Sequence, residues 1–221
     1  MITEIIGVIG LGNAGGAVAG ALARKTKVVG FDPDPERCLR AGDLGVDCVS
    51  STEELAEKTD HIILSLPKPE ISIAVTKTLC DSASRPKLLI ETSTVTPQTA
   101  ITCNDLCKQN DIAYVDAAIA GGVASMAAGE ITFFLGGADE NKKLASKILN
   151  LIAASIHDLG PVGAGMGTKV VNNAVMHALM VVLIEAFSMS NKLGVSSQTM
   201  IEILNREEGL LRPLVHRVQE R

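Results

Sequence analysis

The sequence predicts an α/β protein: a doubly wound, mostly parallel Rossmann-type sheet, followed by the start of an all-helical C-terminal domain. Short apolar strands alternate with amphipathic helices as far as residue 159, and only helical patterns follow. Continuous apolar strands are typical of parallel sheets that helices cover on both faces. A glycine-rich turn directly after the first strand supports the same fold.

The first strands and helices alternate regularly. Ser51 begins a Ser-Thr-x-Glu-Glu capping signature, Pro35 and Pro97 stand near helix starts, and Pro67 ends a strand. We expect strands at 4–9, 27–31, 61–66 and 87–90, and helices at 14–23, 35–41, 51–58 and 96–109.

The alternation continues and then stops. We expect strands at 111–118, 131–135 and 155–159, and a helix at 142–153. One long helix at 168–192, closed by Gly194 at its C′ position, and a second at 197–205 follow. We expect the glycines at 161–165 to form a flexible joint. The sequence therefore predicts a Rossmann domain at 1–162 and an incomplete helical substrate and dimerisation domain at 163–221.

Composition narrows the class of protein. Of the 221 residues, 47% are hydrophobic and 20% are charged, which is typical of a globular protein with a real core. The net charge of −5, the lack of a basic run and an aromatic content of 2% argue against a nucleic-acid partner. Five scattered cysteines are typical of a reducing compartment, and we expect no metal site.

Two further observations concern the location of the protein. The N-terminus has no visible secretory signal, so we expect a cytoplasmic protein. The longest apolar stretch, residues 174–187, is interrupted by His177 and Glu185. We expect this stretch to be too short and too polar to span a bilayer, and we expect no membrane partner.

The glycine-rich turn has the G-x-G-x-x-G pattern of a dinucleotide site. Its residues are Gly10, Leu11, Gly12, Asn13, Ala14 and Gly15. Such glycines permit a tight turn, the approach of a pyrophosphate and close packing of helix on strand, and the helix N-terminus faces the anion. The alternative is a structural glycine turn without a ligand.

Asp32 ends the second strand, about 20 residues after Gly12, which is the spacing of the ribose-binding acid in this motif. Its carboxylate would accept hydrogen bonds from the ribose hydroxyls and repel a 2′-phosphate. The cofactor is therefore predicted to be NAD, with NADP less favoured, although Arg37 lies nearby and would soften the preference.

Two more strand ends carry candidate cofactor contacts. Leu66 and Pro67 end one strand, and Ser93 and Thr94 follow the next. Ligands of open α/β sheets bind outside the carboxyl ends of strands. The alternative for the hydroxyl cluster is N-capping of the following helix, and both roles can coexist.

Paired glycines follow a third strand end. Gly121 and Gly122, preceded by Ala120, would expose backbone amides to a substrate carboxylate. A turn that requires positive φ explains the same glycines, and the residues alone leave both interpretations open.

Lys169 and Asn173 are four residues apart, so they share one face of the long helix. Apolar neighbours are expected to lower the pKa of Lys169 and to prepare it for proton transfer. A solvated surface charge is the alternative. His177 lies four residues further on and is expected to be a buried core histidine.

In order, these segments resemble the β-hydroxyacid dehydrogenase family, which includes 3-hydroxyisobutyrate dehydrogenase, tartronate semialdehyde reductase and the cofactor domain of 6-phosphogluconate dehydrogenase. The resemblance covers essentially the whole chain. The matching segments are 8–15, 66–67, 93–97, 116–122, 163–173 and 185–186 before Gly194.

The resemblance implies NAD(P)-dependent oxidation of a small 3-hydroxy acid, or reduction of the matching semialdehyde. It implies that Lys169 moves the hydroxyl proton and that Asn173 is the family's substrate-side asparagine. Gly121 and Gly122 match the paired glycines that bind the substrate carboxylate.

Two departures from the family pattern matter. The family usually has Ser or Thr where this chain has Ala120, which leaves the identity of the acid open. Family members usually continue for several dozen residues beyond Arg221, so we expect either a truncated chain or a cover from another chain. The helix at 168–192 is apolar on most of its circumference, which predicts a homo-oligomer, most simply a homodimer, through it.

Two other functions remain open from the sequence. The first is an imine reductase-like enzyme, against which Lys169 counts, because similar imine reductases usually carry another residue there. The second is a non-catalytic NAD-binding module, which Ala120 and the short C-terminal part support.

Overall fold

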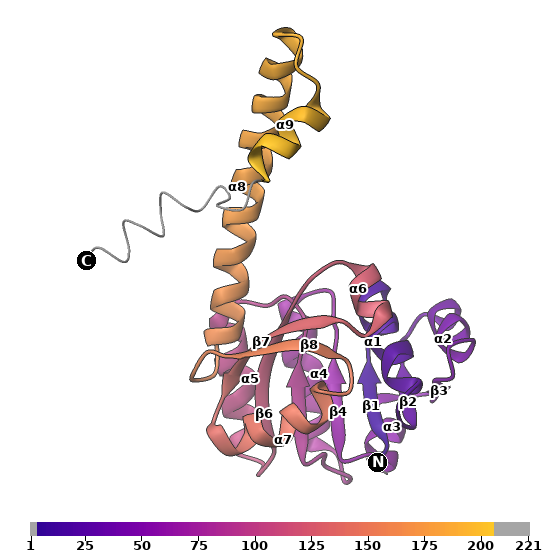
Figure 1. Cartoon of the computed structure of the whole chain (residues 1–221). Helices are drawn as coiled ribbons and strands as arrows, with labels where there is room; N and C mark the ends of the chain where they lie inside the picture. Colours follow the sequence, from indigo (N-terminus) through magenta and orange to yellow (C-terminus); the bar gives the residue numbers. More distant parts are fainter. Residues whose placement is uncertain (1–3, 206–221) are drawn as a thin grey trace. The chain divides into compact units, whose positions relative to one another are not determined.

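The computed structural model describes residues 4–205, and the chain divides into two compact units, Met1–Val171 and Asn172–Arg221. The first unit holds an eight-stranded sheet with helices on both faces (Figure 1). The Rossmann-type fold class is therefore confirmed. The domain boundary between residues 162 and 163 stays a prediction.

The strands follow the order β3-β2-β1-β4-β5-β6-β7-β8. All neighbouring pairs are parallel except β6 and β7, which pair antiparallel with Ala120 opposite Thr132. The strands are β1 (Ile6–Ile9), β2 (Val28–Phe31), β3 (Asp47–Cys48), β4 (His61–Leu64), β5 (Leu88–Glu91), β6 (Ala113–Ala120), β7 (Ile131–Gly137) and β8 (Ala153–Asp158).

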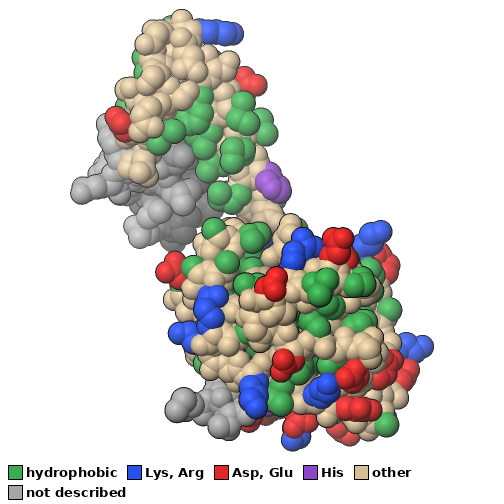
Figure 2. Space-filling view, turned by 90° about the vertical axis from the view of Figure 1, so that its right-hand side faces the viewer, with side chains coloured by type: hydrophobic (Ala, Val, Ile, Leu, Met, Phe, Trp, Pro, Cys, Tyr) green, Lys and Arg blue, Asp and Glu red, His purple; other side chains and the backbone are tan. Residues whose placement is uncertain are grey.

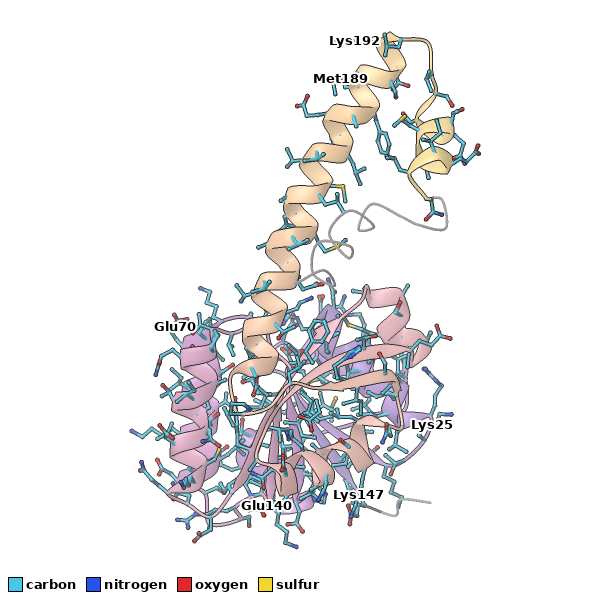
Figure 3. All side chains as sticks on the ribbon, turned by 60° about the vertical axis from the view of Figure 1, so that its left-hand side comes forward. Lys25, Glu70, Glu140, Lys147, Met189 and Lys192 are labelled. Atoms are coloured by element: carbon cyan, nitrogen blue, oxygen red, sulfur yellow. The ribbon has the colours of Figure 1, made fainter. Side chains whose placement is uncertain are left out.

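Seven helices of the first unit connect these strands within the described residues. They are α1 (Asn13–Ala23), α2 (Pro35–Gly42), α3 (Thr52–Lys58), α4 (Pro69–Asp81), α5 (Pro97–Lys108), α6 (Val123–Ala128) and α7 (Asp139–Leu149). Three of them begin with proline at the first helical position, where the missing N–H costs no hydrogen bond. The charged side chains of Glu70, Glu140 and Lys147 point outward from α4 and α7 (Figure 3).

The core consists of two aliphatic clusters, one on each face of the sheet. Alternate residues of one strand join different clusters: Val8 packs with α1, α6 and α7, whereas Ile9 packs with α3, α4 and α5. Side chains of a strand point alternately to the two faces, so both faces are covered. Tyr114 and Phe133 are the fully buried aromatic residues among those described.

Three elements were not predicted. β3 has two residues, and α6 has six and follows paired glycines, so neither has a periodic pattern. The buried face of α4 includes Ser72 and Thr76, and these polar residues interrupt the apolar stripe that identifies a helix.

The long helix α8 (Ala164–Lys192) begins four residues earlier than predicted. The expected flexible joint at 161–165 is therefore wrong at its end, because Ala164 and Gly165 are helical. A Cβ at position 165 would overlap the carbonyl oxygen of Phe134, so this glycine permits close packing of the helix. Only Gly160 and Gly163 have the positive φ of a turn in this stretch, +98° and +92°.

In the second unit, α8 is followed by α9 (Ser197–Leu204). Gly194 has φ +79°, as predicted for the residue after a helix, and Ser196 caps α9 by accepting a hydrogen bond from the amide of Thr199 at 3.1 Å. Met189 and Lys192 mark the last turns of α8 in Figure 3.

The apolar surface of α8 corrects two expectations. Hydrophobic side chains gather along this helical unit (Figure 2), and His177, predicted to be buried, is exposed. By length and composition α8 could cross a membrane, since it has 29 residues and contains an 18-residue stretch with a mean hydropathy of 1.7. The apolar segment is therefore longer than the predicted stretch at 174–187 and long enough to span a bilayer. Core helices of soluble proteins have the same length and composition.

Candidate functional site

The predicted cofactor residues follow strands that end at one edge of the sheet. The register pairs Ile9 with both Phe31 and Leu64, and Leu64 with Glu91. The chain winds outward in one direction through β2 and β3 and in the other through β4 and β5. This reversal beside β1 is the position at which open α/β sheets bind their ligands.

The glycine-rich turn is packed as a dinucleotide motif requires. Gly10 has φ +92°, and a Cβ there would overlap the carbonyl oxygen of Ser65. A Cβ on Gly15 would overlap the carbonyl oxygen of Gly10. Position 12 is open: the nearest atom to a Cβ there is Nη1 of Arg37, at 3.8 Å. Gly12 is also the N-cap of α1, so the first amides of this helix are accessible to an anion.

Asp32 lies beside this turn, and its carboxylate is already engaged. Its Oδ2 atom accepts a hydrogen bond from the amide of Leu11 at 2.8 Å, and Oδ1 accepts one from Asp34 at 2.9 Å. Arg37 pairs with Oδ2 at 3.4 Å. A carboxylate offers about four lone-pair positions, and these three donors leave one of them for a ribose hydroxyl, while exchange with Arg37 would free a second. The long distance and the partial exposure of Arg37 allow that exchange.

A cleft of about 350 Å³ lies against the turn. Gly12 and Asn13 line it on the side of α1, and Arg37 and Arg40 line it on the side of α2. Exposed helix amides and nearby guanidinium groups are suited to the pyrophosphate and adenosine half of a dinucleotide. The residues of this edge therefore fit an NAD(P) cofactor.

The next two strand ends are joined by a hydrogen bond. Ser93 is buried, and its Oγ accepts from the amide of Leu66 at 2.7 Å. Thr94 is exposed beside it. The N-cap of α5 is Thr96, whose side chain accepts from Thr99 at 3.1 Å. Capping therefore belongs to Thr96, and Ser93 instead connects the two loops.

Glu91 stabilises the connection between these two loops. Its Oε1 atom accepts a hydrogen bond from the amide of Ser93 at 2.9 Å, whereas Oε2 is buried without a hydrogen-bond partner. Burial raises the pKa of Glu91 to about 7. The hydrogen bond from the amide of Ser93 opposes this rise. Glu91 was not predicted as a site residue, because a glutamate at a strand end gives no signal of burial.

The paired glycines lie at the far end of β6. Gly121 has φ +129°, and both Gly121 and Gly122 are exposed. A Cβ on Gly122 would meet no atom within 4 Å, so packing does not explain this glycine. Gly121 requires its positive φ, which matches the turn interpretation, and the exposed amides remain compatible with an anion.

Asp116 of β6 joins the sheet to the start of α8. It is fully buried, and its Oδ1 and Oδ2 atoms accept hydrogen bonds from the amides of Gly163 at 2.8 Å and Met166 at 2.9 Å. Burial raises the pKa of Asp116, although these backbone donors oppose the rise. The sequence analysis placed Asp116 in a matching segment without a role, because its partners lie about 50 residues away along the chain.

Lys169 follows Met166 by three residues, within the first unit. It is partly buried, and burial lowers its pKa from the ordinary value of 10.5, which confirms the predicted direction. The cause is desolvation, as predicted, although the apolar neighbours Val170 and Val171 are themselves exposed. Asn173 belongs to the second unit, and its role stays a prediction. The described residues contain no cluster of three metal-binding side chains.

Comparisons with known proteins identify relatives. Residues 5–163 match the family described as the NAD binding domain of 6-phosphogluconate dehydrogenase. A probable 3-hydroxyisobutyrate dehydrogenase of Mycobacterium tuberculosis is 31% identical over 205 residues, which are 92% of this chain and 70% of that protein. The mitochondrial 3-hydroxyisobutyrate dehydrogenase of Homo sapiens is 29% identical, and the match covers 92% of this chain and 62% of that protein.

Solved structures of similar proteins include members of the same family. Mycobacterium tuberculosis 3-hydroxyisobutyrate dehydrogenase with L-serine has a TM-score of 0.85 at 30% identity, covering 94% of this chain and 72% of that chain. An imine reductase of Streptomyces aurantiacus has a TM-score of 0.86 at 17% identity, covering 99% and 77%, and shares the fold alone. The chain therefore belongs to the β-hydroxyacid dehydrogenase family of oxidoreductases that act on a CH–OH group, and its first unit is an NAD(P)-binding Rossmann domain.

Proposed function

We propose that this protein catalyses the NAD-dependent oxidation of a small 3-hydroxy acid to its semialdehyde, and the reverse reduction, with Lys169 as the acid/base. The observation that carries the proposal is a lysine with a lowered pKa in the same unit as a dinucleotide turn. The relatives named 3-hydroxyisobutyrate dehydrogenase make 3-hydroxyisobutyrate the first substrate to test.

A bound nicotinamide cofactor would supply the hydride-transfer chemistry for the oxidation of the carbinol carbon. Lys169 takes the proton of the substrate hydroxyl at its Nζ atom, for which it must be neutral. Asn173 holds the substrate hydroxyl. The amides of Gly121 and Gly122 bind the carboxylate, and Ala120 offers no hydroxyl group to it.

The cofactor is held along the carboxyl edge. The amides of Gly12 and Asn13 bind the pyrophosphate. The turn itself is shaped by Gly10, Leu11, Ala14 and Gly15. Asp32 receives the adenosine ribose, and its negative charge favours NAD over NADP. Leu66, Pro67, Ser93 and Thr94 form the wall beside the nicotinamide half, and the hydrogen bond between Ser93 and Leu66 supports this assignment.

The exposed part of α8 supplies the proposed partner surface. Ten large apolar side chains between Val170 and Leu193 are at least 48% exposed, which a protein in water cannot leave uncovered. We infer that α8 is covered in a homodimer and that the protein works in the cytoplasm without a membrane or nucleic-acid partner.

The test is an assay of 3-hydroxyisobutyrate and related 3-hydroxy acids with NAD and NADP. Lys169→Ala is expected to lower kcat by about 1,000-fold or more, because general-base catalysis typically contributes 100- to 10,000-fold. Lys192→Ala on the same helix is the matched control and should keep full activity. Turnover that survives Lys169→Ala would reject the assigned acid/base. Binding of NADH without turnover of any acid would favour a non-catalytic module.

The pH profile gives an independent check. Because the pKa of Lys169 lies below 10.5, the rate of oxidation should rise with pH and level off below pH 10.5. Reduction requires the protonated amine, so its rate should fall over the same range. The measurement is kcat as a function of pH in both directions. An oxidation rate that is independent of pH across this range would contradict the assignment.

A further inference from the structure

We propose that Asp116 is a positioning residue that fixes the first turn of α8 and so holds Lys169 at the carboxyl edge of the sheet. The inference rests on the proposed role of Lys169, but the contact itself can be tested without any assay of activity.

The start of α8 has no N-cap side chain of its own. The residue before the helix is Gly163, which carries no hydroxyl or carboxylate to accept the free amides of the first turn. Asp116 performs this function from a different element, because it accepts the amides of Gly163 and Met166 with its two oxygens. Helix starts leave four amides without an intrahelical partner, and a charged acceptor is the strongest way to hold them.

Two glycines leave space for the carboxylate of Asp116. A Cβ on Gly136 of β7 would lie 2.5 Å from Oδ1 of Asp116 and 2.7 Å from the carbonyl oxygen of Pro161. A Cβ on Gly165 would lie 2.9 Å from Oδ2. Glycines on two different elements thus leave room for one buried acid, and the acid contacts only backbone donors.

The hydrogen bond between Asp116 and Met166 affects the position of Lys169 because the two helical residues are close along α8. Met166 is one helical turn before Lys169, so a shift of the Met166 amide moves the lysine with it. The same segment contains Gly163, Gly165 and Gly167, and glycine is a poor helix former, so local preference does little to fix where the helix begins. Asp116 therefore determines the place of this turn more than the sequence of the turn does.

The experiment compares two ways of disturbing the contact with one matched control. Asp116→Asn keeps the shape but turns an amide donor toward one of the two backbone donors. Gly165→Ala disturbs the contact from the side of the helix. Gly167→Ala is the control, because its Cβ would lie 3.6 Å from the nearest atom, Cγ of Pro97, an ordinary contact. Both glycine changes raise helix propensity equally.

Three measurements are made on the full chain. Hydrogen exchange of the amides at 163–166 should accelerate about tenfold or more in both variants, because Asp116→Asn weakens the hydrogen bonds to a buried charge and the Cβ of Gly165→Ala displaces the first turn. The kcat value should fall about 100-fold, as expected for a misplaced acid/base, with the Kd for NADH within about threefold of the parent. The rise of the oxidation rate should move to higher pH, since a less buried lysine regains its ordinary pKa.

Gly167→Ala should match the parent in all three measurements. Unchanged hydrogen exchange at 163–166 in both disturbing variants would overturn the proposal, as would faster exchange with an unchanged kcat and an unchanged pH profile. Should Asp116→Asn fail to fold, Gly136→Ala replaces it, because the atom nearest to the new Cβ would be Oδ1 of Asp116, at 2.5 Å. If Lys169→Ala retains activity, the assignment of Lys169 as the acid/base is wrong, and the hydrogen-exchange result still decides whether Asp116 holds the turn.

Discussion

The two halves of the cofactor edge are built by contacts of very different separation along the chain. On the adenosine side, the hydrogen bond that holds Asp32 against the glycine turn joins it to Leu11, which is 21 residues away. On the catalytic side, Asp116 holds Gly163 and Met166 across 47 and 50 residues. The Leu11–Asp32 contact is therefore short enough in sequence to belong to a recognisable motif. The Asp116 contacts form only when segments far apart in the sequence pack together.

The largest expected effect tests the local half. Gly15→Ala places a Cβ against the carbonyl oxygen of Gly10 and 2.9 Å from Cβ of Ser65. Since the first neighbour is backbone, we expect the free energy of unfolding to fall by about 3 kcal/mol and NADH binding to be lost. Urea denaturation and NADH fluorescence titration measure the two effects.

Gly42→Ala is the matched control for this change, because a Cβ there meets nothing within 4 Å. Its stability should be unchanged or higher by about 0.5 to 1 kcal/mol, since alanine restricts the unfolded chain. A Gly15→Ala protein as stable as Gly42→Ala would show that the turn is not closely packed and would remove the contrast between the two halves.

The next effect tests the catalytic half through Glu91, which pairs in register with Asp116. Its pKa is raised from 4.5 to about 7, so the folded protein holds this proton more tightly than the unfolded chain. The resulting stability is fully present below pH 4.5 and is lost as pH rises through 7. The linkage corresponds to about 3 kcal/mol across this range.

Glu91→Gln should remove this dependence, because glutamine stays neutral while its oxygen still accepts the amide of Ser93. The variant should therefore be more stable than the parent at pH 8 and similar at pH 4.5, as measured by urea denaturation across that range. Glu57→Gln, at an exposed acid, should keep the slope of the parent. A slope that persists in Glu91→Gln would locate the titrating group elsewhere.

The smallest expected effect concerns the choice of cofactor. Asp32→Asn removes the negative charge and one acceptor, so the Kd for NADH should rise about tenfold, while the Kd for NADPH should fall. Titrations with both cofactors measure the ratio. Asp34→Asn is the control, because Asp34 also pairs with Arg37, at 3.3 Å, but lies outside the turn. Equal changes in both variants would assign the preference to Arg37.

Prediction from the sequence succeeded where neighbours along the chain decide the structure. The glycine turn, the strand that ends before Asp32 and the positive φ of Gly194 all follow from short segments. The structure brings Leu66 and Ser93 together as expected from strands that end at one edge. The cofactor and catalytic roles of these residues stay predictions.

Prediction failed where distant contacts decide. The start of α8 was predicted at residue 168, because glycines are typical of flexible joints. No residue close to it in the sequence indicates that Asp116 caps the helix. The buried face of α4 carries Ser72 and Thr76, so its pattern resembles a loop. The pKa of Glu91 depends on burial by several elements, which a single sequence does not contain.

The reach of Asp116 along the chain also has a consequence for the order of assembly. Closing a segment of about 50 residues is entropically more costly than closing one of about 20, and contacts of high separation form late in folding. During synthesis the partners Leu11 and Asp32 leave the ribosome well before Met166 does. All residues of the nucleotide-facing half are therefore synthesised before the segment that Asp116 holds. We expect the catalytic half to fold later than the nucleotide-facing half.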